Sequence, residues 1–157
     1  MQKITPFLWF DDNAEEAAQF YASVFKNAEI GTVTRYSAVG PGPEGSASTV
    51  GFTLEGLEFG SVNGGPIFNF SPAISFAIAC EDQAEVDYFW ERLSEGGKTG
   101  QCGWLTDRFG LSWQVVPTVL RELLSASDPD TARRVTEVML PMTKLDIAAL
   151  QAAAEKS

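Results

Sequence analysis

The sequence predicts an α+β fold in which two similar βαβββ modules are followed by helices. The main observation is a repeat, because ITPFLWFDDNAEEAAQFYASVF returns 70 positions later as ISFAIACEDQAEVDYFWERL. Each copy opens with an apolar strand and enters a helix through an acidic residue with a carboxylate three positions on, Asp12 with Glu15 and Asp82 with Glu85. Two unrelated strand-to-helix units would give similar segments. However, the strand, the helix cap and the helix of the second copy all lie 70 positions after those of the first, which favours a duplicated module.

The first copy is predicted to form one complete module. Its apolar periodicity and β-branched runs predict, in order, strand 4–10, helix 13–25, strand 31–38 and strands near 47–55 and 57–63. The stretch GPGPEGS, residues 40–46, is typical of a mobile surface loop. Its glycines match the GxGxxG spacing, but two prolines interrupt the motif and a strand follows where a dinucleotide site needs a helix, so we reject that site.

The second copy repeats this order and leads into a helical tail. Its expected elements are strand 74–79, helix 83–94, a short strand near 98–101, a strand at Trp104 and Leu105, and a last strand at 111–116. The tail is expected to hold helices near 118–125, 129–140 and 144–154. We therefore expect a single pseudo-symmetric domain over 1–157, with internal repeats at about 4–63 and 74–116 and a C-terminal helical tail at 118–157.

Composition and charge exclude several classes of function. The 157 residues are 45% hydrophobic, which is enough for one sizeable core. Twenty-one acidic and eleven basic residues give a net charge of −10, which repels both nucleic acid and anionic membranes. Because the sequence has no signal segment and no apolar run long enough to span a bilayer, we expect a soluble, cytoplasmic protein.

The usual catalytic nucleophiles are also excluded. The chain contains no histidine, so neither a Ser/His/Asp nor a Cys/His system can form. Cys80 and Cys102 are too few and wrongly spaced for a disulfide scaffold or a four-thiolate metal site, so we expect buried thiols. Asp107 and Arg108 could serve as an acid and an anchor, although an aspartate that opens a tight turn ending in Gly110 is more often structural.

Two segments carry a resemblance to a known family. CGWLTDRFGLSWQVVP, residues 102–117, and MLPMTKLDIAAL, residues 139–150, resemble the PhnB-like branch of the vicinal oxygen chelate superfamily. That superfamily contains glyoxalase I, bleomycin-resistance proteins and extradiol dioxygenases, and the branch is commonly labelled 3-demethylubiquinone-9 3-methyltransferase. The resemblance covers nearly the whole chain. It implies that the paired modules curl into a cup-shaped, partly open barrel, often in a homodimer.

The resemblance also implies where metal ligands would lie. In metal-using members the ligands come from the first and last strands of each module, which here gives Thr5, Ser75, Gln114 and a fourth position near 58–60. Hydroxyl and amide groups are weak ligands for a divalent ion, which prefers imidazole and carboxylate donors. Since the chain has no histidine, we expect neither a metal nor another cofactor.

Strand alternation groups the residues that would line a metal-free cup. One wall is aromatic and the other carries small side chains, which leaves room for a flat or apolar ligand held by a few hydroxyl and amide groups. The alternative is that these aromatic residues are plain core and the cup is collapsed. The candidate ligand-pocket residues are Thr5, Phe7, Trp9, Ser75, Ala77, Ser112 and Gln114.

Three classes of function remain open. The first is a metal-free protein that binds an unknown small molecule, as in the bleomycin-resistance branch. The second is an enzyme of the same fold, either the methyltransferase that the family label suggests or a lyase or dioxygenase-like enzyme. No glycine-rich turn with an acidic ribose partner supports methyl transfer. The third is a dimeric regulatory or interaction module whose dimer surface matters more than its cup, and whose tail helices could pack on a partner subunit or close the cup. No catalytic residue can be assigned.

Overall fold

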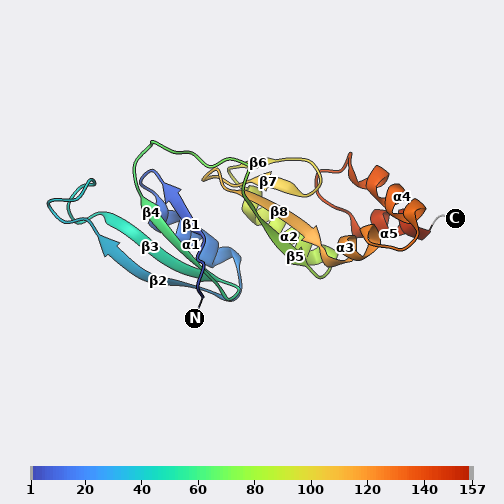
Figure 1. The fold of residues 1–157 in the computed structure, drawn as a ribbon, viewed down its shortest axis with the longest axis horizontal. Coiled ribbons are helices and arrows are strands. Elements are labelled where there is room, and N and C mark those ends of the chain that lie inside the picture. Colours follow the sequence, from blue (N-terminus) through green and yellow to red (C-terminus); the bar gives the residue numbers. More distant parts are fainter. Residues whose placement is uncertain (1, 156–157) are drawn as a thin grey trace. The chain divides into compact units, whose positions relative to one another are not determined.

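The computed structural model describes residues 2–155, and its contacts divide the chain into two compact units at Phe70 and Ser71. The first unit holds one βαβββ module (Figure 1). Its elements are β1 (Phe7–Phe10), α1 (Ala14–Val24), β2 (Ala28–Arg35), β3 (Ala47–Leu54) and β4 (Leu57–Asn63). They form a sheet in the order β1-β4-β3-β2, in which only the β1–β4 pair is parallel.

The second unit holds the repeated module and the tail. Its elements are β5 (Ser75–Cys80), α2 (Gln83–Ser94), β6 (Lys98–Thr99), β7 (Trp104–Thr106), β8 (Ser112–Pro117), α3 (Thr118–Leu124), α4 (Pro129–Met139) and α5 (Ile147–Glu155). The strand order β5-β8-β7-β6 matches the first sheet position by position, again with one parallel pair, β5–β8. The predicted α+β class with two βαβββ modules and C-terminal helices is confirmed. Over residues 2–155 the strands form two separate four-stranded sheets.

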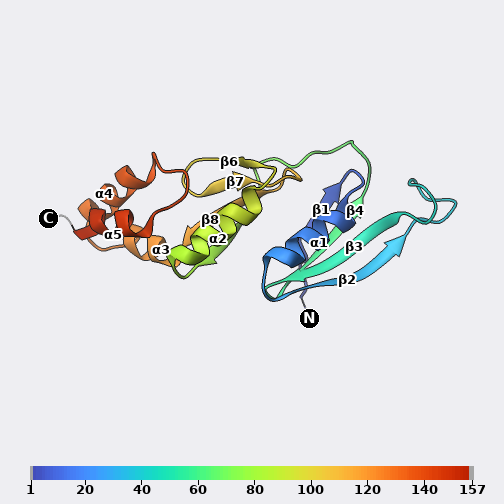
Figure 2. The same ribbon diagram turned by 180° about the vertical axis from the view of Figure 1, so that it is seen from behind.

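Each sheet is covered on one face by the helix of its own module (Figures 1 and 2). In the first unit Tyr21 of α1 is fully buried against Phe52, at 5.9 Å between ring centroids, and Phe52 stacks on Phe59. In the second unit, side chains of α2 such as Val86 and Leu93 are fully buried, as is Val115 of β8.

Three predicted boundaries are wrong for physical reasons. The first strand begins at Phe7 instead of residue 4, because Pro6 has no N–H to add to the ladder. The second strand begins at Ala28, where pairing with Leu54 extends the ladder toward the turn. The last helix begins at Ile147 instead of residue 144, since its first N–H is bound by a side chain of α2.

A separate apolar cluster holds the tail helices together. The buried members are Leu120, Val135, Leu145, Leu150 and Ala153, which come from α3, α4, α5 and the segment before α5. Among residues 2–155 no helix, in the tail or elsewhere, is both long enough and apolar enough to cross a bilayer.

Candidate functional site

The face of the second sheet opposite α2 is the part of the molecule that best fits a ligand site. Strand pairing sets Ser75 beside Ser112, Ala77 beside Gln114, and Ala79 beside Val116. The alternate residues Trp113 and Val115 are buried on the α2 side. The register therefore places these residues on one face of the sheet, as the alternation along each strand predicts. We call this surface the open face of the second sheet.

A cavity of about 310 Å³ lies on this face, where α3 leaves the end of β8. No loop separates the two elements, because β8 ends at Pro117 and α3 begins at Thr118. The first turn of α3 therefore forms one wall of the cavity. We call this cavity the β5–β8 pocket; its lining residues are Ala77, Ile78, Ala79, Gln114, Val116, Pro117, Thr118 and Arg121.

The lining of the β5–β8 pocket is mostly apolar and includes three polar side chains, those of Gln114, Thr118 and Arg121. Ala77 and Ala79 are exposed, so their small side chains leave space above β5. The Nε2 atom of Gln114 donates to the Ser75 Oγ at 2.9 Å, which fixes the amide and leaves its second N–H and its carbonyl available. Arg121 is the one lining residue with a charge.

The predicted aromatic wall belongs to the first unit and packs on its own sheet. Thr5 precedes β1 and is exposed. Phe7, 62% exposed, lies over Gly60, where an added Cβ would come within 2.4 Å of the ring. Trp9 covers Gly64 in the same way, and its Nε1 donates to the Gly65 carbonyl at 2.9 Å. Neither aromatic side chain lines the cavity of about 590 Å³ in the first unit.

The four other predicted positions divide between lining and burial. Ser112 shares the open face of the second sheet but is 2% exposed and lies outside the pocket lining. Ala77 and Gln114 line the β5–β8 pocket, and Ser75 joins it through its hydrogen bond with Gln114. Sequence reasoning missed Thr118 and Arg121, because only the direction in which α3 leaves β8 brings them to the pocket.

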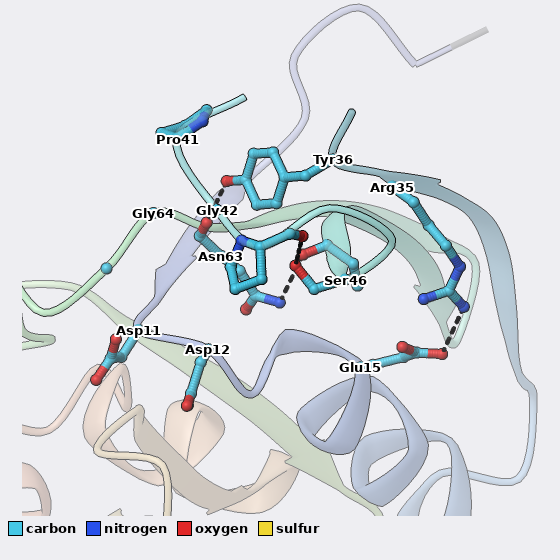
Figure 3. Close-up of a pocket in the computed structure, with 13 residues that line it drawn as sticks. Asp11, Asp12, Glu15, Arg35, Tyr36, Pro41, Gly42, Ser46, Asn63 and Gly64 are labelled. Atoms are coloured by element: carbon cyan, nitrogen blue, oxygen red, sulfur yellow. Dashed lines mark hydrogen bonds and ion pairs between the residues drawn. The ribbon is translucent and has the colours of Figure 1, made fainter. Parts of the chain in front are cut away.

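The second cavity, of about 590 Å³, lies in the first unit between the start of α1 and the loop after β2 (Figure 3). Carboxylates line one side: Asp11, Asp12 and Glu15, of which Glu15 pairs with Arg35 at 3.6 Å. The other side is the loop at residues 40–46, folded over the ring of Tyr36. We call it the loop pocket.

Asn63 ties the elements around the loop pocket together. Its Oδ1 accepts from the backbone N–H of Ala14 at 2.9 Å, and its Nδ2 donates to the Ala47 carbonyl at 3.1 Å. The Tyr36 hydroxyl donates to the Asn63 carbonyl (Figure 3). These bonds join α1, β3, β4 and the end of β2, so the polar groups of Asn63 are used in holding the fold.

The positions that the superfamily resemblance assigns to metal ligands do not fit a divalent ion. Ser75 and Gln114 hydrogen-bond to one another and offer a hydroxyl and an amide, without an imidazole or carboxylate beside them. Glu58 of β4 is exposed. Over residues 2–155 no group of three or more His, Cys, Asp or Glu side chains is placed to hold a metal.

Comparison with known proteins places the chain in a family. The family model described as 3-demethylubiquinone-9 3-methyltransferase matches residues 2–116, which is more than half of the chain. The chain belongs to this 3-demethylubiquinone-9 3-methyltransferase family. The family match ends before α3, so Thr118 and Arg121 of the β5–β8 pocket lie outside it. No curated protein matches the chain.

Solved structures support the same assignment. The PhnB protein from Bacillus cereus is 38% identical, with a TM-score of 0.69, over 74% of this chain and 100% of that one. Protein PA1353 from Pseudomonas aeruginosa, at 20% identity and a TM-score of 0.62, is aligned over 74% of this chain and 98% of its own. The fosfomycin resistance protein FosX from Mesorhizobium loti shares the fold at 14% identity and a TM-score of 0.53, over 78% and 98%. The vicinal oxygen chelate fold expected from the sequence is confirmed.

Proposed function

We propose that the protein binds a small molecule in the β5–β8 pocket without a metal. The observation that carries this proposal is the cavity itself, whose lining is mostly apolar with a few polar groups, as ligand pockets commonly have. Its volume is at the lower end of the range for small-molecule sites. The ligand is therefore a compact molecule with a flat or apolar body.

The lining favours binding over catalysis. The polar lining consists of an amide, a hydroxyl and a guanidinium, from Gln114, Thr118 and Arg121, and these are side-chain types that do not exchange protons in proteins. None of these groups can take up and release a proton near pH 7, as a general acid or base must. Binding with sequestration needs only the shape and the hydrogen bonds that the lining offers.

A neutral bicyclic probe, 2-naphthamide, tests the proposal. Trp104 of β7 pairs with Gln114 and shares the open face of the second sheet, so a bound ring should change its fluorescence. We expect a saturable change that is lost in Trp104→Phe, and a rise in melting temperature with ligand concentration, because a ligand that binds only the native state stabilises it by mass action.

Filling the pocket gives the decisive control. Ala77 is exposed, so Ala77→Trp should fold with a free energy of unfolding within about 0.5 kcal/mol of wild type and should no longer bind the probe. Ala84→Trp, on the exposed side of α2, should keep binding. A loss of about 1–3 kcal/mol in Ala77→Trp would instead indicate an overpacked core, and unchanged binding by the folded variant would place the probe elsewhere.

Methyl transfer is the second candidate, favoured by the description of the family model. The strand-to-helix turns of the two modules, residues 11–13 and 81–82, are acidic and lack the glycines that let a backbone approach a nucleotide. Titration with S-adenosylmethionine by calorimetry distinguishes the candidates. Stoichiometric binding that survives Ala77→Trp would favour methyl transfer at another site.

A further inference from the structure

We infer that the ligand of the β5–β8 pocket carries an anionic group, a carboxylate or a similar oxyanion, that is held by Arg121. This inference rests on the proposed function and names the class of ligand. The chain carries a net charge of −10, yet the pocket lining contains no carboxylate and one guanidinium. The local charge is thus opposite to that of the whole molecule, and it attracts the kind of ligand that the rest of the surface repels.

Arg121 is available for such a ligand. Within residues 2–155 the carboxylates that pair with Arg35, Arg133 and Lys144 do not reach its guanidinium. Its backbone carbonyl accepts from the N–H and the hydroxyl of Ser125, which anchors the C-terminal end of α3. The backbone carbonyl of Arg121 is therefore used in ending the helix, while its guanidinium remains at the pocket wall for a partner from outside the chain.

The neighbouring polar groups suit an oxyanion as well. A guanidinium presents parallel N–H donors that match the two oxygens of a carboxylate. Gln114 keeps one Nε2 hydrogen after its bond to Ser75, and Thr118 carries a hydroxyl in the same lining. These groups add neutral donors beside the charge, and the apolar lining at Ala77, Ala79 and Val116 receives the body of the ligand.

The exposure of Arg121 limits how much its charge can add to the affinity for an anionic ligand. Arg121 is exposed, and exposed ion pairs contribute about 0.2–1 kcal/mol, which is at most about a fivefold change in affinity. Screening by salt should reduce the effect further. The preference for an anion is therefore modest and is measurable only between ligands that differ in charge alone.

A matched pair of probes provides that comparison. We expect wild type to bind 2-naphthoate about fivefold more tightly than the neutral 2-naphthamide in low salt, and the preference should shrink as salt is added. Arg121→Gln should bind both probes equally. Arg133→Gln removes the same charge from the exposed side of α4 and should leave the preference intact.

The outcomes separate this inference from the proposed function. If Arg121→Gln keeps the preference for 2-naphthoate while Ala77→Trp abolishes binding, the inference about Arg121 is wrong, and the proposal that the β5–β8 pocket binds a small molecule is supported. If Arg133→Gln lowers the preference as much as Arg121→Gln, the effect comes from net charge and the assignment to Arg121 is wrong. If wild type binds neither probe, both proposals fail.

Discussion

Cys80 illustrates how burial decides the chemistry of a single residue. It is the last residue of β5, is fully buried, and pairs with Pro117 at the end of β8. Burial, reinforced by the negative charge of Glu85, raises the pKa of its thiol from the ordinary 9.0 to about 12. Because the thiolate is the reactive form, the folded protein keeps this cysteine inert. As pH rises through 9, only the unfolded chain loses this proton, so the contribution of Cys80 to stability decreases from there.

The two cysteines should therefore differ in reactivity. At pH 8 we expect dithionitrobenzoate to label Cys102, which is half-buried at the surface, and to label Cys80 only after denaturation. The release of thionitrobenzoate should correspond to one thiol per native chain and to two in guanidinium. Cys102→Ser should remove the fast reaction. Rapid labelling of the folded Cys102→Ser variant would show that the thiol of Cys80 is accessible.

The helix starts show which residue-scale features a sequence can predict. Asp82 caps α2 as expected, with its carboxylate accepting from the Glu85 N–H at 2.9 Å. The matching prediction for Asp12 is wrong, because the N-cap of α1 is Asn13 and has no side-chain cap bond. The Ala14 N–H is bound instead by Asn63, 49 positions away. A local motif is readable from the sequence, whereas a donor bound from a distant strand depends on the finished fold.

At the scale of elements, one side chain of α2 joins this helix to the tail. The Oε1 of Gln83 accepts from the Ile147 N–H at 2.8 Å, at the start of α5, and its Nε2 donates to the Leu145 carbonyl at 3.1 Å. Asp87 adds an ion pair with Lys144 at 2.9 Å. Hydrogen bonds from Gln83 and Lys144 lower the pKa of the Asp87 carboxyl. The contribution of Asp87 is therefore complete above its unfolded pKa, near 4, and is lost as pH falls through the lower folded value.

Replacing Gln83 should loosen the tail selectively. In Gln83→Ala the N–H of Ile147 loses its acceptor, and we expect local stability over residues 144–155 to fall by about 1–2 kcal/mol. Hydrogen exchange read by mass spectrometry should show faster exchange there and unchanged exchange in the first unit. Gln151→Ala, at an exposed position of α5, is the matched control. Equal protection in the two variants would mean that the apolar cluster alone holds the tail.

Some elements of the site can likewise be predicted from local sequence, whereas others depend on the finished fold. Helix α2 follows the predicted range 83–94, because Asp82 opens it and Gly96, with φ of 75°, follows its end. The period of two along each strand likewise suffices to group Ala77 with Ser75 and Gln114 with Ser112. The pocket wall could not be predicted, because Arg121 reaches it only through the direction in which α3 leaves β8.

At the scale of the whole molecule, net charge and exposed apolar side chains have opposite effects on the association of two copies of the chain. Several large apolar side chains are exposed, among them Ile4, Phe7, Phe68 and Ile74, each at 60% or more. Exposed apolar groups that lie together in one patch commonly mark a surface that pairs with another molecule. The net charge of −10 opposes contact between two copies. Since salt screens repulsion and leaves apolar burial intact, ionic strength decides the balance.

We therefore propose that the protein forms a homodimer whose association strengthens with added salt. Sedimentation at micromolar concentration in 0.15 M salt should give twice the chain mass of 17.0 kDa, and dilution in low salt should favour the monomer. Phe7→Glu should weaken the dimer, because it adds a charge at an exposed apolar position of β1, an edge strand. Val39→Glu adds the same charge to the exposed loop after β2 and should not. A single 17.0 kDa species at every salt concentration would contradict the dimer. Equal weakening by both variants would instead attribute the effect to net charge and not to the apolar surface around Phe7.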